Sequence, residues 1–285
     1  MYKRKGRKID VERIRDTVAR LCVEANTRLP ADVRAALETA SAGEESPAGR
    51  EILGQLCANA DLAAADGMPI CQDTGMAVVF LSIGQDVRLT GGDLRAAVDA
   101  GVAEGYRIGR LRASVVADPL LRGNTGDNTP AVIHIDIVPG DRIGITVAPK
   151  GFGSENMSAV RMLSPSDGEE GVRRFVLEAV DRAGANPCPP VIVGIGIGGT
   201  FEQVALLAKT ALLRPIGSRS PLPHIARLED SLLGEINRLG IGPAGYGGTV
   251  TALGLAIETA PTHIAGLPVA LNMSCHATRH ASAEL

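Results

Sequence analysis

Three cysteines stand on irregular, polar segments where neither helix nor strand packing would require a thiol. They are Cys71 in PICQDTG, Cys188 in NPCPP and Cys275 in NMSCHATRH. Thiolates are common ligands of zinc and of iron–sulfur clusters, and irregular segments often carry functional sites. The chain has no CxxC pair, so spacing alone leaves two interpretations open: a shared metal site, or separate packed thiols.

Two further cysteines have a different setting. Cys22 lies in IDVERIRDTVARLCVE (9–24), where apolar residues recur at helical spacing after Asp10, a candidate N-cap. Cys57 lies in a second helix-forming stretch with an apolar face. Free cysteine is among the residue types most often buried in protein cores. We therefore predict that Cys22 and Cys57 are core thiols.

The segment GIGIGG (194–199) matches the G-x-G-x-x-G pattern between an apolar strand and a helix. Such a turn can hold the pyrophosphate of a dinucleotide. However, the region about 20 residues onward, RPIGSRSPLP, has no acidic residue for a ribose, and the strand lies deep in the chain. The pattern favours a tight turn with close packing, and a dinucleotide-binding oxidoreductase is the alternative.

Two polar, glycine-rich stretches contain groups that can bind small anions. They are LRGNTGDNTP (121–130) and APKGFGSENMS (148–158), with Arg122, Asn124, Lys150, Gly153, Ser154 and Asn156. Exposed backbone N–H groups beside Arg and Lys can hold an anion, but the same residue types also build ordinary hairpin loops and Asx turns. The residues alone leave both interpretations open.

Arg112 and His263 are the remaining candidates. Arg112, in GRLRASVVADPL, could clamp a carboxylate through two hydrogen bonds or form a surface ion pair. His263, in APTHIAG, lies in a predicted turn, where a histidine serves either as an acid or base or as a structural hydrogen-bonding residue.

The composition indicates an ordinary folded chain and argues against several partners. Of the 285 residues, 45% are apolar, 21% are charged and 2% are aromatic, and the formal charge is −3. These values argue against a nucleic-acid surface, and no apolar run is long enough to span a membrane. No apolar stretch of a secretion signal follows the basic start MYKRKGRKID. Five scattered cysteines are then expected to be reduced thiols, which favours a cytoplasmic location.

The hydrophobic pattern predicts a mixed α/β fold, with helices around one or two mixed β-sheets in a single domain over residues 1–285. Helices are expected over 9–24, 30–67 (with a break near Ser46-Pro47), 90–109, 171–184 and 227–239. A β-rich run covers 75–84, and two strands around Pro139-Gly140-Asp141 are predicted to form a hairpin. Residues 189–213 read as strand, glycine turn and helix, and short apolar pieces follow to residue 275.

Several of these segments together closely resemble the class I fumarases. The matching segments are PICQDTG, NTGDNTP, PKGFGSEN, GIGIGGTFEQVALLAKTALLRP and the cysteine near the end of the chain. The family consists of iron–sulfur hydro-lyases and includes fumarate hydratase and L(+)-tartrate dehydratase. The resemblance runs from about residue 10 to the C-terminus. It implies fumarate hydratase, an enzyme of the tricarboxylic acid cycle, as the expected activity and tartrate dehydratase as the alternative.

The resemblance also implies a cofactor. Three cysteines of the family hold one [4Fe–4S] cluster, and the matching positions here are Cys71, Cys188 and Cys275. Three thiolates leave one iron without a protein ligand, and this iron is an open Lewis acid that can bind a leaving hydroxyl group.

Five other positions match family residues that meet a small dicarboxylate substrate. Gln72 and Asp73 resemble a substrate-contacting pair. Arg112 resembles the arginine that grips a substrate carboxylate, and Gly153 the glycine whose backbone meets the substrate. His263 resembles an active-site histidine, so either Asp73 or His263 is expected to handle the proton of the leaving oxygen.

The resemblance finally implies a partner. The chain ends ten residues after Cys275, whereas single-chain family members continue into a second domain with the proton-abstracting base and further substrate contacts. We therefore expect an α subunit that works with a β subunit, as an α2β2 heterotetramer.

Overall fold

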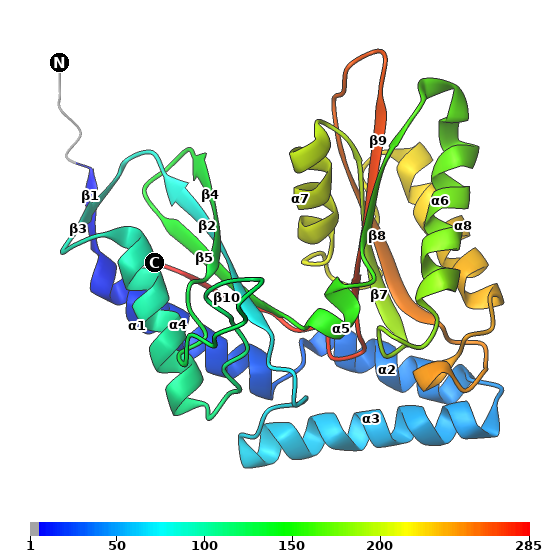
Figure 1. Ribbon diagram of the computed structural model, residues 1–285, viewed down its shortest axis with the longest axis horizontal. Coiled ribbons are helices and arrows are strands. Elements are labelled where there is room, and N and C mark those ends of the chain that lie inside the picture. Colours follow the sequence, from blue (N-terminus) through cyan, green and yellow to red (C-terminus); the bar gives the residue numbers. More distant parts are fainter. Residues whose placement is uncertain (1–5) are drawn as a thin grey trace. The chain divides into compact units, whose positions relative to one another are not determined.

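The computed structural model describes residues 6–285, so the first five residues of the basic N-terminal segment lie outside the described part. The chain divides into two compact units. Unit 1 contains the chain up to Pro30 together with Ala60–Gly151 and Arg279–Leu285, and unit 2 contains Ala31–Asn59 and Phe152–Thr278. Figure 1 labels the elements of each unit. The predicted mixed α/β class is confirmed.

Unit 1 is built on a four-stranded mixed sheet. Its elements are β1 (Arg7–Asp10), α1 (Val11–Thr27), β2 (Met76–Gly84), β3 (Val87–Thr90), α4 (Leu94–Ile108), β4 (Val132–Val138), β5 (Ile143–Lys150) and β10 (Ala281–Glu284). The sheet has the order β10-β5-β2-β4, and β1 pairs with β3 in a separate two-stranded sheet. Strand β4 is parallel to β2, while β5 is antiparallel to both β2 and β10.

Helices α1 and α4 form the core of unit 1 with one face of this sheet. Asp10 caps α1, as predicted, because its carboxylate accepts from Glu12 N–H, and Asp93 caps α4 in the same way. The apolar stripe of α1 is fully buried together with alternating residues of β2 and β5. Cys22 belongs to this stripe, so its prediction as a core thiol is confirmed. Cys57 is only half-buried, so it is not a core residue as predicted.

The predicted hairpin over residues 131–150 is wrong. Strands β4 and β5 do form, but β2 lies between them and pairs with both. The Pro139-Gly140-Asp141 turn instead crosses the end of β2, where Asp86 N–H donates to Gly140 O at 2.9 Å. Alternating apolar residues and a turn signal reveal two strands and a reversal, but they contain no information about a third strand between the two.

Unit 2 is built on a second four-stranded mixed sheet with the order β6-β9-β7-β8. Its elements are α2 (Ala31–Gly43), most of α3 (Pro47–Asp66), α5 (Phe152–Glu155), β6 (Ala159–Leu163), α6 (Gly168–Ala183), β7 (Val191–Gly198), α7 (Phe201–Ala211), α8 (Pro223–Arg238), β8 (Ala252–Ala260) and β9 (Leu267–Ser274), with short 3-10 turns at Pro165–Asp167 and Pro243–Gly245. Helix α7 covers one face of the sheet, and α6 and α8 cover the other (Figure 1).

The GIGIGG glycines serve close packing between β7 and α7. A Cβ atom at Gly196 would collide with Val204 O and lie 2.8 Å from the backbone nitrogen of Ala208, and one at Gly194 would collide with Ala208 O. Backbone atoms of a helix cannot move aside as a flexible side chain can, so only glycine lets the helix approach the strand this closely. The packing interpretation therefore accounts for the glycine pattern.

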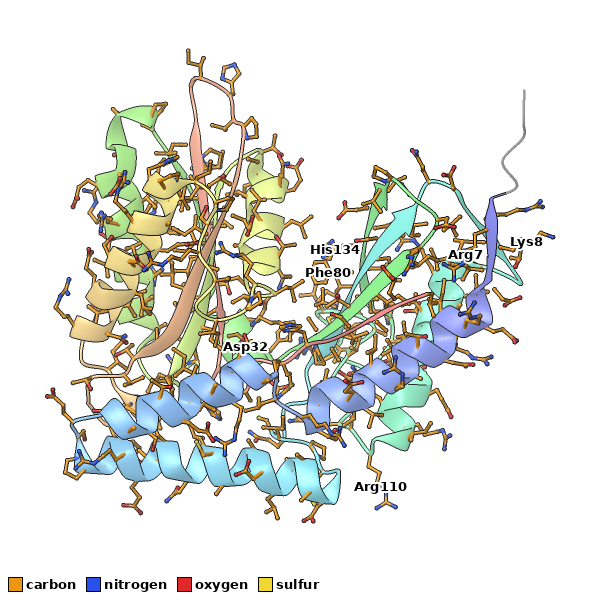
Figure 2. All side chains as sticks on the ribbon, turned by 180° about the vertical axis from the view of Figure 1, so that it is seen from behind. Arg7, Lys8, Asp32, Phe80, Arg110 and His134 are labelled. Carbon is orange, nitrogen blue, oxygen red and sulfur yellow. The ribbon has the colours of Figure 1, made fainter. Side chains whose placement is uncertain are left out.

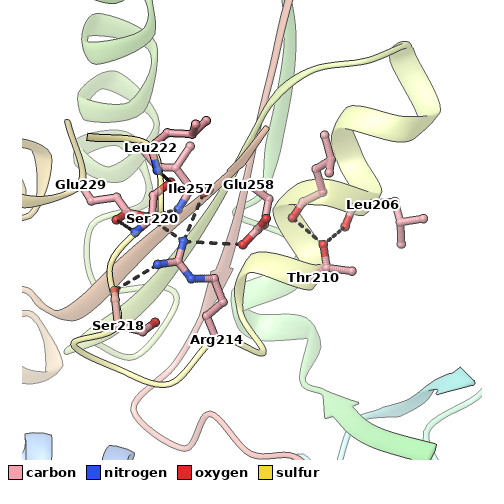
Figure 3. Close-up of polar contacts among 10 residues, drawn as sticks. Leu206, Thr210, Arg214, Ser218, Ser220, Leu222, Glu229, Ile257 and Glu258 are labelled. Atoms are coloured by element: carbon pink, nitrogen blue, oxygen red, sulfur yellow. Dashed lines mark hydrogen bonds and ion pairs between the residues drawn. The ribbon is translucent and has the colours of Figure 1, made fainter. Parts of the chain in front are cut away.

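A buried ion pair joins the loop after α7 to α8 in unit 2 (Figure 3). Arg214 Nη1 donates to the Glu229 carboxylate at 2.7 Å, and only 4% of the Glu229 side chain is exposed. The same carboxylate accepts from the backbone N–H groups of Ser220 and Ile257, both at 2.8 Å. A carboxylate paired in this way avoids the cost of an unpaired buried charge and fixes the loop after α7.

A second buried carboxylate, Glu44, holds the end of α2 to the loop before β8. Only 1% of Glu44 is exposed. Its oxygens accept from the backbone N–H groups of Ser46, Thr249 and Val250 at 2.8–3.0 Å. Burial raises the pKa of this carboxyl, but the hydrogen bonds outweigh burial, so that the pKa lies below its usual value of 4.5.

Replacing Glu44 should therefore destabilise unit 2 in a pH-dependent way. A carboxyl whose pKa is lower in the folded state stabilises the fold fully above its unfolded pKa and loses this contribution as the pH falls through the folded value. We expect Glu44→Gln to lower the free energy of unfolding by about 2–3 kcal/mol at pH 7 and to flatten the loss of stability below about pH 4.5. Urea unfolding at several pH values measures both the free energy of unfolding and its dependence on pH. Glu45→Gln, at the exposed neighbouring position, is the control, and an equal effect there would contradict the assignment.

Candidate functional site

In unit 1, the segment from Ile70 to Gly75 carries Cys71, Gln72 and Asp73 and leads directly into β2. Asp73 closes an Asx turn, in which its Oδ1 accepts from Gly75 N–H at 3.1 Å. Gly75 has a φ of +74°, and a Cβ atom there would lie 2.7 Å from the Lys150 carbonyl carbon. The turn therefore needs a glycine, and its sharp bend leaves Gln72 exposed and Cys71 and Asp73 half-buried.

Three buried side chains pair with the carbonyl oxygens of this segment. The Tyr106 hydroxyl lies 2.8 Å from Thr74 O and 2.9 Å from Gly75 O. Asn128 Nδ2 donates to Gly75 O at 3.1 Å, and the Arg279 guanidinium donates to Asp73 O. Burial raises the pKa of the Tyr106 hydroxyl, with a smaller contribution from Cys22, so Tyr106 stays protonated as a donor at physiological pH. The thiol of Cys71 is thus mounted on a firmly held turn.

Arg112 is linked to the same turn. Thr74 Oγ1 donates to Arg112 O at 3.1 Å, and Thr74 is only 2% exposed while the Arg112 side chain is exposed. The structure therefore brings Arg112 together with the Cys71–Asp73 segment within unit 1. The carboxylate-clamp interpretation of Arg112 stays a prediction, because this contact places its backbone and not its guanidinium group.

In unit 2, Cys188 and Cys275 lie at the same end of the sheet. Cys188 precedes β7 and Cys275 directly follows β9, and these strands pair antiparallel up to Ile192 and Ser274. His276 Nδ1 lies 3.1 Å from Cys188 O, and this contact joins the two cysteine segments. Cys188 is exposed and has a φ of +56°, which is uncommon for a residue other than glycine. Such strain is typical of positions held for function.

Gly153 lies beside the Cys188 segment. A Cβ atom placed on Gly153 would have only Asn186 O nearby, at 3.7 Å, so crowding does not explain the glycine. The α5 turn that carries Gly153 is held by Glu155, whose carboxylate accepts from Lys209 Nζ at 2.6 Å and from Asn272 Nδ2 at 2.7 Å. The backbone at Gly153 is therefore fixed, and the space where a side chain would stand is open. This arrangement suits contact between the Gly153 N–H group and a ligand.

His263 lies at the other end of the same sheet. It belongs to the β8–β9 turn, while Cys188 precedes the start of β7, and β7 and β8 run parallel. The eight residues of β7 span about 25 Å. His263 is exposed, and its Nδ1 accepts from Ala265 N–H at 3.1 Å. Within one chain, the structure therefore does not bring His263 together with Cys188 and Cys275.

Comparison with known proteins decides the family. The family model described as "Fumarate hydratase (Fumerase)" matches residues 15–284. The chain belongs to this Fumerase family. A Methanocaldococcus jannaschii protein provisionally named L(+)-tartrate dehydratase subunit alpha is 45% identical over 277 residues, which cover 94% of this chain and 96% of that protein.

Two enterobacterial relatives carry the same name without the provisional mark. The L(+)-tartrate dehydratase subunit alpha of Escherichia coli UTI89 is 38% identical over 273 residues, and that of Escherichia coli K12 is 37% identical over 273 residues. Each alignment covers 94% of this chain and 89% of the relative. The Fumerase family is thus matched along nearly the whole chain, as the sequence motifs predicted.

Fumerase-family hydro-lyases carry an iron–sulfur cluster, and the donor set of this chain suits one. The five cysteines, all within residues 6–285, form no disulfide. Cys71, Cys188 and Cys275 stand on irregular segments with partial or full exposure, whereas burial raises the pKa of Cys22 to about 12. In the described part of the chain, no group of three His, Cys, Asp or Glu side chains is gathered as a ready-made metal site. Soft thiolate donors at Cys188 and Cys275, joined through His276, fit a cluster better than a hard cation.

Several residues that position this site are not apparent from the sequence. Tyr106, Asn128, Arg279 and His276 act through backbone carbonyls of distant segments. His276 and Arg279 follow Cys275 in CHATRH, and Asn128 lies in NTGDNTP. Their position next to a motif was the only sequence signal that could have indicated a role in positioning the thiols. Tyr106 gave none, because on α4 it reads as one more core residue.

The environments of the thiols predict a selective reaction in the cluster-free chain. Only the thiolate reacts with iodoacetamide, so Cys22, buried and with a pKa near 12, should stay unmodified at pH 8 while exposed Cys188 is alkylated. Mass spectrometry of proteolytic peptides after timed labelling measures both sites. Denatured protein, in which every cysteine should react, is the control. Labelling of Cys22 as fast as Cys188 in the native chain would contradict the described burial.

Proposed function

We propose that this chain is the α subunit of an iron–sulfur hydro-lyase that removes water from a four-carbon hydroxydicarboxylate, with L(+)-tartrate as its substrate. The observation that carries the proposal is the match to the Fumerase family along residues 15–284, with the family's cysteines standing on the anchored turns described above. The sequence motifs favoured fumarate hydratase. The names of the relatives favour tartrate dehydratase, so tartrate becomes the main proposal and malate the alternative.

In this proposal, Cys71, Cys188 and Cys275 hold a [4Fe–4S] cluster as thiolates. When bound, the cluster supplies one iron without a protein ligand, which acts as a Lewis acid toward the leaving hydroxyl group and a substrate carboxylate. The chain's part is to keep the thiolates on rigid segments. Tyr106 and Arg279 do this for the Cys71 turn, and His276 does it for the Cys188 segment.

The substrate contacts follow from the same turns. Arg112 would pair with one carboxylate through two parallel N–H···O bonds, which fixes the orientation of the dicarboxylate. The Gln72 amide and the Gly153 N–H group would donate to the remaining oxygens. Gly153 is suited to this by its open Cβ position, and Gln72 by its exposure on the Asp73 turn.

Proton transfer to the leaving oxygen is assigned to Asp73 rather than His263. Asp73 stands two residues after Cys71 on the same anchored turn, so its carboxyl group is held on the same segment as the thiol. His263 lies a full strand length from Cys188 within its own chain. A part for His263 in the same reaction would require that another chain supply it.

The partner is proposed to be a β subunit, because the relatives are named as alpha subunits. Loss of water requires a base that removes a weakly acidic proton next to a carboxylate, and the β subunit would supply it, in an α2β2 assembly acting in the cytoplasm. No helix among the described residues is long and apolar enough to cross a membrane.

Removal of any proposed ligand should abolish retention of the cluster. With two thiolates a [4Fe–4S] centre is poorly held, so we expect Cys71→Ala, Cys188→Ala and Cys275→Ala to lose iron and sulfide after anaerobic reconstitution. Iron and sulfide analysis with visible absorption measures the loss. Cys22→Ala and Cys57→Ala are the controls, and Cys22→Ala should cost only about 1 kcal/mol of stability. A cluster retained by one of the three variants but lost in a control would overturn the ligand assignment.

The substrate proposal predicts a preference that turnover can measure. The complex of this chain with its β subunit, prepared anaerobically, should convert L(+)-tartrate to oxaloacetate and water with a higher kcat/KM than it converts malate to fumarate and water. This chain without its partner should turn over neither. A preference for malate would leave the hydro-lyase family assignment intact and replace the substrate. Turnover by the chain alone would show that it contains the base.

A further inference from the structure

Strand β4 is an open edge of the unit 1 sheet. Within residues 6–285, β4 pairs with β2 on one side, and no strand lies on its other side. An open edge presents unpaired backbone donors and acceptors, so proteins usually protect it with charge, proline or short length. Here the edge is seven residues long and contains five β-branched apolar residues.

Two isoleucines at this edge are exposed although they point to the core face. Ile133, Ile135 and Ile137 are paired with Val79, Leu81 and Ile83 of β2, so all share one face of the sheet. Ile133 packs against the core, but Ile135 is 38% exposed and Ile137 69% exposed. Adjacent exposed isoleucines on an open edge strand are typical of a surface that another strand covers.

The sequence of β4, VIHIDIV, is self-complementary about Ile135. When the sequence is aligned with its own reverse, each apolar residue matches an apolar residue. The two polar positions match histidine with aspartate. In an antiparallel pairing centred on Ile135, His134 of one chain faces Asp136 of the other, and this happens twice. Ile135 faces its own copy, and Ile137 faces Ile133. Such cross-strand pairs are stabilising.

Neighbouring registers lack this property. The nearest registers that keep the isoleucines on one face move the centre by one residue, to His134 or Asp136. These place histidine opposite histidine or aspartate opposite aspartate, which is unfavourable. The other sheet offers a contrast: its edge strand β6 reads AVRML, and pairing about its centre would place Arg161 against Arg161. Of these two edge strands, β4 is the one suited to pair with itself.

One further contact orients a side chain of β4 before any partner strand arrives. His134 stacks on Phe80 of β2, with ring centroids 5.1 Å apart, and Figure 2 shows the two side chains next to each other. Because this contact holds the imidazole on β4, the histidine loses less freedom when a partner strand arrives. Asp136 is exposed on the same face of the strand.

We propose that two copies of this chain associate through β4, as an antiparallel pair about a two-fold axis at Ile135. The two four-stranded sheets of unit 1 then form one continuous sheet of eight strands. The pairing covers Ile135 and Ile137 and satisfies the open backbone groups of both copies. It is independent of the proposed substrate and cluster, and it identifies the surface on which two α chains meet.

Complementary charge variants test the partner and the register together. His134→Asp and Asp136→His each place like residues opposite one another in a homodimer, so each should weaken dimerisation by about tenfold or more. An equimolar mixture of the two variants restores histidine opposite aspartate at both positions. Native mass spectrometry, which separates the variants by mass, should show a dimer containing one of each. Dimers of unchanged strength in the separate variants, or a mixture without the mixed dimer, would overturn the proposal.

Cysteine cross-linking tests the geometry without changing charge. Residues facing each other across an antiparallel pair have Cα atoms about 4.5–5.5 Å apart, within reach of a disulfide. Ile135→Cys should therefore cross-link two chains under mild oxidation. Ile137→Cys, at the more exposed position, faces Ile133 of the other copy and should not. Non-reducing electrophoresis and peptide mapping give the result.

The oligomeric state of the full chain completes the test. The unmodified chain should sediment as a dimer at micromolar concentration, and Ile137→Lys should convert it to a monomer that keeps its circular dichroism spectrum and still unfolds cooperatively, since this exposed side chain adds little to the fold of the single chain. A monomeric unmodified chain would overturn the proposal, as would a dimer that cross-links more readily through position 137 than 135. These readouts do not depend on turnover, so they succeed or fail separately from the proposed activity.

Discussion

The buried hydroxyl of Tyr106 lies against the carbonyl oxygens of Thr74 and Gly75, and the turn that carries Cys71 depends on this contact. A turn that exposes a thiol cannot pair its own carbonyl groups as a helix or strand does, and unpaired buried carbonyls are costly. Side chains from α4, from the segment before β4 and from the last residues of the chain supply the missing donors. Elements scattered along the sequence are thus required to hold one five-residue turn.

In unit 2, the register of the strands determines where the two thiols lie. Cys188 and Cys275 are neighbours because β7 and β9 pair up to Ile192 and Ser274, and a slip by one residue would displace Cys275 by about 3.3 Å and reverse its side. The register is maintained by burial of both faces. Valine and isoleucine of β7 pack on α6 and α8, while its glycines admit α7. The glycines that resemble a nucleotide-binding motif therefore help to position a thiol.

Local features of this fold could be predicted from the sequence, and long-range pairing could not. Helix α1 and its Asp10 cap, the break before Pro47 and the strand–turn–helix of β7 and α7 follow from short-range periodicity and capping chemistry. The separation of β4 from β5 by β2 has no local signal. The cysteines and Arg112 are proposed from motifs, whereas Tyr106 acts through a hydroxyl that no pattern distinguishes from a core aromatic residue.

Strand β9 connects the two functional features of unit 2. Asn272 donates to both Glu155 and Ser158 and so fixes the α5 turn that carries Gly153, and the same strand ends at Ser274, directly before Cys275. The Lys209–Glu155 ion pair adds α7 to this arrangement, with both side chains about three-quarters buried or more. A displacement of β9 would therefore move the proposed substrate contact and the proposed cluster ligand together. Gly153 is tied to β9 through the hydrogen bonds that Asn272 donates, and Cys275 through the covalent chain. Their separation is thus fixed within one packed unit, as a reaction at a bound hydroxyl group requires.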